Sequence, residues 1–209
     1  MAFRPAWTIV ENKIMCKEFC FEWNGGFAIS QKKKNIANLH LAIKEMTNET
    51  ALEVSSKGTV QLGREIGAFS LKYNDSPLEN VFQSSKKYEL GGPYLDLLDV
   101  EPKESKRDNR HKTSGKLMGF VFDEDIWSLQ PKTAFYDYLY FNALIQNYGI
   151  NLDLNKYDWF TDIEFNPNKS INCQARSVAV YKLIQKMNMF DSIKSKNTWL
   201  DFHKNHVCD

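Results

Sequence analysis

The segment that most restricts the fold is AFYDYLYFNALIQN, residues 134–147, which is apolar around nearly its whole circumference when placed on a helix. Such a helix has no polar face to turn toward water, so other elements must cover it on every side. We therefore expect it at the centre of the molecule. Pro131 is expected in its first turn, where a missing backbone N–H costs no hydrogen bond.

The size of the chain favours one domain. It has 209 residues, of which 43% are hydrophobic and 13% aromatic, enough for one core but short for two. The net charge of +1 excludes a polycation, so any affinity for nucleic acid must come from a local basic patch. The four cysteines form no CxxC pair and the first residues form no apolar leader, so we expect a reducing cytoplasm and no membrane partner.

The C-terminal residues His203, His206 and Cys208 are of types that bind metals. They lie on an end of the chain that we expect to fray, and no second ligand pair accompanies them. We therefore expect neither a metal nor a cofactor.

The remaining pattern alternates strands with helices. Residues 7–30 are rich in β-branched and aromatic side chains around Gly25-Gly26, which predicts short strands and a hairpin. A helix follows the Lys32–Lys34 run, because Ile36, Leu39, Ile43 and Met46 repeat with a helical period. Residues 51–73 predict short extended pieces interrupted by glycines, and the chain after Ser76 is expected to be mainly helical, with a last long helix over residues 172–189.

Residues 76–86 allow two interpretations of one acidic side chain. Ser76 and Glu79 have the spacing of a capping box, with Pro77 in the first helical turn. On a helix, Gln83 and Lys86 lie within about 40° of Glu79, so the three form one polar face. That face can bind a sugar hydroxyl or a phosphate and polarise a water molecule. The helix cap and the binding site stay open as alternatives.

A second pair of carboxylates follows in FTDIEFNP. Asp162 and Glu164 alternate, so in an extended chain both point to one side and either could join Glu79 in a pocket. Two carboxylates across a glycosidic bond are the usual requirement for acid/base work on a sugar. The alternative for Asp162 is a local turn before Pro167. Trp127 and Lys132 offer a stacking face and a charge, although a tryptophan is more often part of the core.

Five segments resemble one protein family. ENVFQSSK, residues 79–86, resembles the E-x-x-[FY]-Q-x-x-K core of the NADAR superfamily, which is named for its association with NAD and ADP-ribose metabolism. Further resemblances follow the family's order: IGAFS, with Gly67 and Ala68 as departures; EPKESKRDNR; WSLQPKTAFYDYLYFNALIQN; and SINCQARSVAVYKLI, with Ala175-Arg176 where small residues are expected. The matches cover about residues 52–190. They divide the single domain into N-terminal strands and a helix (1–51), a catalytic core (52–190) and a C-terminal segment (191–209).

The resemblance implies an α+β, predominantly α-helical NADAR (YbiA-like) fold. Its N-terminal segment resembles the subgroup encoded beside DNA-modifying ADP-ribosyltransferase toxins, which acts as antitoxin. The implied activity is that of an N-glycosidase that removes ADP-ribose from guanine bases in DNA. The implied partners are ADP-ribosylated DNA, ADP-ribose and a cognate toxin that need not bind directly.

With that activity in view, Glu79 is expected to activate water or to stabilise the oxocarbenium charge, and Asp162 or Glu164 to supply the second carboxylate. The remaining candidates are Lys57, Lys86 and Arg110 for the diphosphate, Gln83 and Asn172 for ribose hydroxyls, and Trp127 for stacking. A different route has Lys132 or Lys57 attack the ring-opened ribose to form a Schiff base.

The basic segment from Lys103 to Lys116 holds six Lys or Arg against two acids, and we expect it to contact DNA phosphates. The alternative is a solvated charged helix. Two rival functions stay open. One is a small-molecule N-glycosidase acting on riboflavin-pathway intermediates, and the other is a non-catalytic protein that binds ADP-ribose or the toxin.

Overall fold

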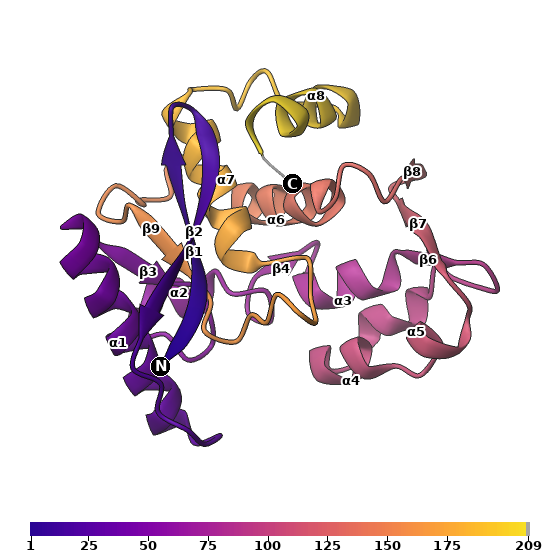
Figure 1. Ribbon diagram of the computed structural model, residues 1–209. Helices are drawn as coiled ribbons and strands as arrows, with labels where there is room; N and C mark the ends of the chain where they lie inside the picture. The colour runs from indigo at the N-terminus through magenta and orange to yellow at the C-terminus, as the bar shows by residue number, and fades with distance from the viewer. Residues whose placement is uncertain (208–209) are drawn as a thin grey trace.

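The N-terminus forms a long antiparallel hairpin in the computed structural model, which describes residues 1–207 (Figure 1). β1 (Ala2–Val10) pairs with β2 (Lys13–Phe21) along its whole length, from Ala2 opposite Phe21 to Val10 opposite Lys13. The turn is Glu11-Asn12, with φ of 49° and 57°. The prediction that Gly25-Gly26 makes the hairpin turn was wrong. The two-residue turn needs left-handed backbone at both positions, and Asn tolerates that conformation. Gly25-Gly26 instead joins β2 to the first helix.

The hairpin belongs to a four-stranded sheet with the order β2-β1-β9-β3. β9 (Trp159–Thr161) runs antiparallel to β1 and parallel to β3 (Ala51–Glu53), so residues far apart in the sequence share one sheet. α1 (Ile29–Thr47) packs on this sheet through Ile36, Leu39 and Ile43, as their spacing predicts. Met46, also assigned to the buried stripe, is instead 61% exposed near the end of α1.

The prediction of a central helix is confirmed. α6 (Ala134–Tyr148) is buried along most of its length and contacts α3, α7 and α8. It begins later than predicted: Thr133 is the N-cap, and Pro131 precedes the first turn.

The C-terminal part of the chain is folded rather than frayed, contrary to the sequence-based expectation. α7 (Gln174–Lys186) corresponds to the last long helix that the sequence predicts, and α8 (Lys196–His206) follows it. The Asp137 carboxylate, in α6, connects these helices: it lies 2.5 Å from Arg176 Nη2, 2.6 Å from Ser177 Oγ and 3.1 Å from His203 Nε2. This buried polar group fixes α7 and α8 to the central helix.

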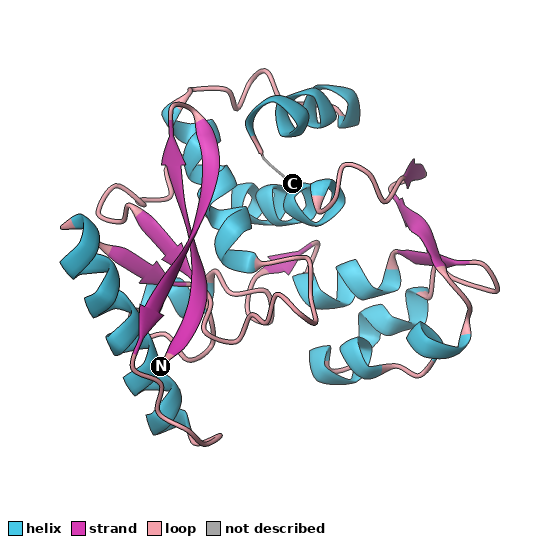
Figure 2. Cartoon of the chain, in the orientation of Figure 1, coloured by secondary structure: helices cyan, strands magenta, loops and turns pink. Residues whose placement is uncertain are grey.

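The stretch after Ser76 is less helical than expected, because it contains a three-stranded sheet of order β6-β7-β8 (Figure 2). Its elements are α3 (Leu78–Ser84), β6 (Lys86–Tyr88), the 3-10 helix η1 (Leu95–Asp99), α4 (Pro102–Arg107), α5 (Arg110–Thr113), β7 (Leu117–Phe122) and β8 (Asp125–Trp127). Before it lie α2 (Gln61–Glu65), β4 (Lys72–Tyr73) and β5 (Ser76–Pro77). α2 occupies part of the region predicted to be extended.

The fold is therefore a single α+β domain with 41% helix and 20% strand. Helix exceeds strand, as predicted, but the strands are neither confined to the N-terminus nor all short. Among residues 1–207, no helix is both long enough and apolar enough to cross a membrane.

Candidate active site

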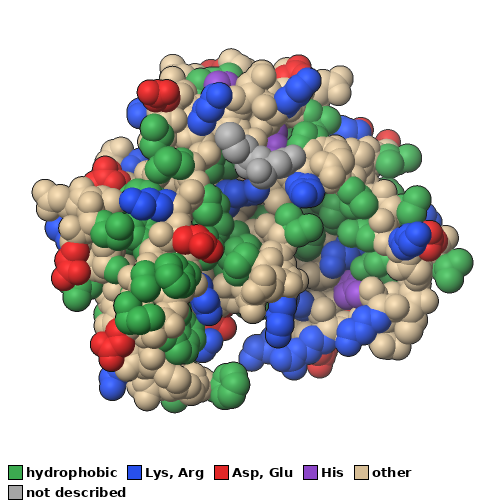
Figure 3. Space-filling model, in the orientation of Figure 1, with side chains coloured by type: hydrophobic (Ala, Val, Ile, Leu, Met, Phe, Trp, Pro, Cys, Tyr) green, Lys and Arg blue, Asp and Glu red, His purple; other side chains and the backbone are tan. Residues whose placement is uncertain are grey.

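A cavity of about 1020 Å³ lies where α3, α4 and two loops, residues 128–133 and 162–174, converge. Figure 3 shows a hollow on this face, with Lys and Arg side chains on both of its sides. Eight of the ten candidate residues from the sequence line the cavity: Lys57, Glu79, Gln83, Lys86, Lys132, Asp162, Glu164 and Asn172. The fold thus brings together residues that are up to 115 positions apart.

A hydrogen-bonded chain along one cavity wall joins Glu79 and Gln83 of α3 to Lys86, the first residue of β6. Glu79 is only 4% exposed, and its Oε1 accepts a hydrogen bond from Gln83 Nε2 at 2.8 Å. Gln83 Oε1 in turn accepts one from Lys86 Nζ at 2.6 Å. The capping-box interpretation of Glu79 was wrong, because Ser76 belongs to β5, Pro77 is the N-cap and no side chain caps the helix. The Glu79 carboxylate therefore lines the cavity and does not cap the helix.

Lys106 reaches this wall from α4. Its Nζ lies 3.6 Å from Glu79 Oε1 and 5.5 Å from the centre of the Phe69 ring, which also lines the cavity. Burial lowers the pKa of Lys86 to about 8, and Lys106 adds to this shift while Glu79 opposes it. An appreciable fraction of Lys86 therefore carries a neutral amine near neutral pH.

Asp162 supplies a second buried carboxylate directly after β9. Its Oδ1 accepts from the Glu164 backbone N–H and its Oδ2 from Gln174 Nε2, both at 3.0 Å. Burial is the main cause, and the nearby Glu53 carboxyl the second, of a pKa of about 8 for Asp162. Burial raises the pKa of Glu53 as well, so this pair of neighbouring carboxyls retains a proton near neutral pH. Glu164 lies at the rim, where its Oε1 is 3.0 Å from Lys32 Nζ.

Glu53 is a residue that the sequence did not single out. Its carboxylate is fully enclosed and accepts hydrogen bonds from Ser55 Oγ at 2.6 Å, Thr161 Oγ1 at 2.7 Å and the Ile163 backbone N–H at 2.8 Å. It therefore fixes the turn that leads to Lys57 and the segment that carries Asp162. The available signal was an acidic residue inside the apolar strand ALEV, where a buried charge needs partners.

Tyr136 also lines the cavity and was not predicted as a site residue. Burial raises the pKa of its phenol well above the ordinary value, and both Glu79 and Asp162 contribute. Its hydroxyl therefore stays protonated at neutral pH.

The cavity wall is basic overall. It is lined by six lysines, Lys57, Lys86, Lys103, Lys106, Lys132 and Lys169, against three acidic residues, Glu79, Asp162 and Glu164. Such a wall suits a ligand with several negative charges, such as a diphosphate.

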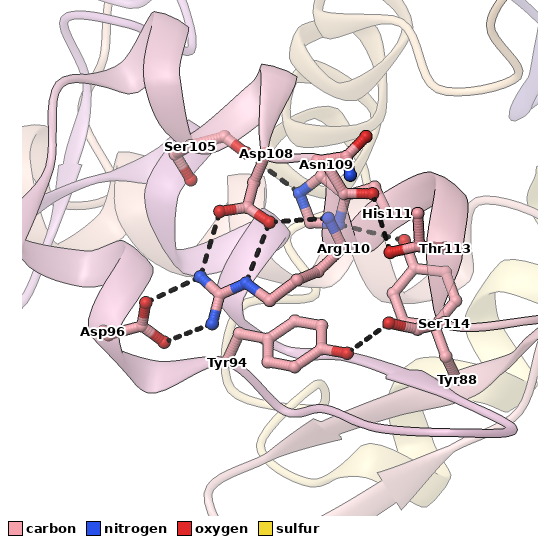
Figure 4. Close-up of polar contacts among 10 residues, drawn as sticks. All are labelled: Tyr88, Tyr94, Asp96, Ser105, Asp108, Asn109, Arg110, His111, Thr113 and Ser114. Carbon is pink, nitrogen blue, oxygen red and sulfur yellow. Dashed lines mark hydrogen bonds and ion pairs between the residues drawn. The ribbon is translucent and has the colours of Figure 1, made fainter.

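Two of the ten candidate residues from the sequence, Arg110 and Trp127, do not line the cavity. The Arg110 guanidinium binds Asp96 through two hydrogen bonds of 2.6 and 3.1 Å, binds Asp108, and lies over the Tyr94 ring at 4.4 Å (Figure 4). It therefore connects α5 to η1. Trp127 is 2% exposed and packs against Phe135 in the core.

Within residues 1–207, no three His, Cys, Asp or Glu side chains lie together as a metal site would require. His203, one of the three C-terminal candidates, is fully buried beside Asp137. His206 Nδ1 lies 2.8 Å from the backbone oxygen of Asn12, and Cys208 lies outside the described residues.

The comparison with known families agrees with this geometry. Residues 2–209 match the model of the family NADAR-DarT1, described as the DarT1-associated NADAR antitoxin. The chain belongs to this family. The match confirms the resemblance that ENVFQSSK and the other segments indicate, and it extends through the N-terminal residues assigned to a subgroup. NADAR proteins are generally ADP-ribose glycohydrolases. No curated protein matches the chain.

Proposed function

We propose that this NADAR chain is an N-glycosidase that removes ADP-ribose from guanine bases in DNA and so reverses the action of the toxin. One observation carries the proposal: Glu79 and Asp162, whose pKa is raised to about 8, line the same cavity, whose wall also presents six lysines. A protonated and an unprotonated carboxylate are the pair that glycosidic hydrolysis needs. The lysines suit the diphosphate, and the cavity volume suits a ligand of nucleotide size.

In this mechanism Asp162 donates its proton to the guanine nitrogen as the bond to the ribose breaks. Glu79 stabilises the positive charge that grows on the ribose and takes a proton from the attacking water. The hydrogen bond from Gln83 and the contact with the Lys106 ammonium orient the Glu79 carboxylate. The products are ADP-ribose and an unmodified guanine in the DNA.

A lysine route leads to the same products. The amine attacks the ring-opened ribose, guanine leaves with its amino group, and water hydrolyses the resulting Schiff base. Lys57 and Lys132 line the cavity, as this route requires, and Lys86 joins them because its lowered pKa leaves part of it neutral. Borohydride reduction during turnover, followed by peptide mass spectrometry, distinguishes this route from direct attack by water.

The decisive experiment incubates the purified protein with ADP-ribosylated guanine in an oligonucleotide, ADP-ribosylated thymine and ADP-ribosylated protein, and quantifies free ADP-ribose by mass spectrometry. We expect release from guanine in molar excess over the protein. Release that never exceeds one equivalent per chain would identify a binder. Activity confined to small riboflavin-pathway N-glycosides would identify the metabolic rival.

A further inference from the structure

The loop before α1 and the start of that helix expose an unusual combination of side chains. Phe27 is 98% exposed and Ile29 is 58% exposed, and Lys33 and Lys34 face solvent one turn later. No acidic residue occurs between Glu22 and Glu45. We call residues 25–34 the α1 edge.

The α1 edge borders the candidate active site. Lys32 Nζ lies 3.0 Å from Glu164 Oε1, and Glu164 lines the cavity, so this part of α1 lies at the cavity rim. Lys103 and Lys106 of α4 also line the cavity. In Figure 1 the beginning of α1 and α4 lie opposite each other, and in Figure 3 basic side chains lie on both sides of the hollow.

Local stability does not explain this composition. Lysines in the second turn of a helix gain nothing from the helix dipole, which favours cations only in the last turn. α1 has no acidic residue in its first turn and no side-chain cap. Of the three consecutive lysines, Lys32 alone forms an ion pair within residues 1–207. Within residues 1–207 the positive charges of Lys33 and Lys34 form no ion pair, and an anionic partner accounts for these charges.

We propose that the α1 edge binds the DNA strand that carries the modified base, so that the strand crosses the mouth of the cavity between α1 and α4. Phe27 stacks on a nucleobase that flanks the modified guanine, and Lys33 and Lys34 contact phosphates. Surfaces that bind single-stranded nucleic acid usually combine aromatic side chains with lysines. Each base can stack on an aromatic ring, and each phosphate carries a negative charge that a lysine can bind. The proposal rests on the proposed function, since it assumes a substrate base inside the cavity.

The test compares two substrates, a single-stranded oligonucleotide with one ADP-ribosylated guanine and the ADP-ribosylated guanosine nucleoside. We expect the double variant Lys33→Ala/Lys34→Ala to raise KM for the oligonucleotide about tenfold with little change in kcat, and to leave the nucleoside unaffected. Its binding should depend less steeply on salt, with a slope lower by about 1.4, since each phosphate contact on a single strand contributes about 0.7. Phe27→Ala should weaken oligonucleotide binding about tenfold without changing that slope, and Phe27→Trp should restore it.

Matched controls lie at the other end of the same helix, where Lys44→Ala and Met46→Ala should change neither substrate. Fluorescence anisotropy with an unmodified oligonucleotide tests the α1 edge independently of turnover. If the parent binds this strand, the α1-edge variants bind it about tenfold more weakly and the parent releases no ADP-ribose, the proposed function fails while the α1 edge stands as a strand-binding surface. If the α1-edge variants bind and turn over the oligonucleotide like the parent, or lose both substrates equally, the inference is overturned. Loss of binding to purified toxin with unchanged DNA binding would overturn it as well.

Discussion

Replacing Glu79 with glutamine distinguishes the effect of this cavity residue on stability from its effect on catalysis. Both contacts of this carboxylate use Oε1, which lies 2.8 Å from Gln83 Nε2 and 3.6 Å from Lys106 Nζ. A glutamine keeps an oxygen that Gln83 can bind. It loses the attraction of Lys106, whose side chain is 57% exposed and therefore well screened, a loss of about 0.2–1 kcal/mol. For a domain of this size the melting temperature should fall by at most about 4 °C.

The effect on turnover should be far larger. A neutral amide can neither take a proton from water nor balance the charge on the ribose, and loss of such a group costs at least ~100-fold in rate, or about 2.7 kcal/mol of barrier. We expect Glu79→Gln to bind ADP-ribose in calorimetry and to release almost none from ADP-ribosylated guanine. The matched control is Glu65→Gln, because exposed Glu65 also accepts a hydrogen bond from a glutamine four residues away but lies outside the cavity wall. Parental turnover in Glu79→Gln would refute the assignment and leave Asp162 or Glu164 as the essential carboxylate.

Three further predictions concern pH, DNA and metals. Asp162 must be protonated to act as an acid and its pKa is about 8, so the parental rate should fall as pH rises above 8. Asp162→Asn should lose most activity and this alkaline fall in rate. A parental rate that is flat to pH 10 would contradict the role of Asp162 as the acid. Because the Glu53 carboxyl is the second cause of the raised pKa of Asp162, Glu53→Gln should move this alkaline fall in rate to lower pH. Arg107→Ala/Lys112→Ala, in exposed positions of the basic segment, should weaken action on modified oligonucleotide and spare the nucleoside, whereas equal loss on both would exclude DNA contact. A chelator should change the rate by less than about twofold, because two carboxylates suffice, and a complete loss restored by metal would show that a metal is required.

The sequence predicted features that depend on one helix or one short motif. The apolar circumference of residues 134–147 placed α6 at the centre. The helical spacing correctly grouped Glu79, Gln83 and Lys86, although Lys86 lies in β6 and not in α3. The hydrogen-bond partners that distant segments supply to single polar residues were missed. Nothing local to Glu53 indicates that Thr161 and Ile163, more than a hundred residues later, will supply its hydrogen bonds.

The same limit explains Arg110. Its segment resembles the family motif, but whether an arginine faces a ligand or an acidic neighbour depends on tertiary structure, and here Asp96 and Asp108 bind it. The hairpin turn was misplaced for a different reason. Gly25-Gly26 is the stronger turn signal, and only the pairing of two nine-residue strands shows that Glu11-Asn12 makes the turn.

The way the two ends of the chain meet has a consequence for its synthesis. β1 pairs with β9, about 150 residues later, and Val207, the last residue described, forms a bridge with Ile14 of β2. Such long-range pairing implies a high contact order, so the hairpin, which is synthesised before β9, has to wait for β9 before its sheet is complete. We expect the cavity, whose wall draws on segments from Ser55 to Gln174, to form late in folding. Ribosome-bound chains that still lack β9 should therefore have no activity.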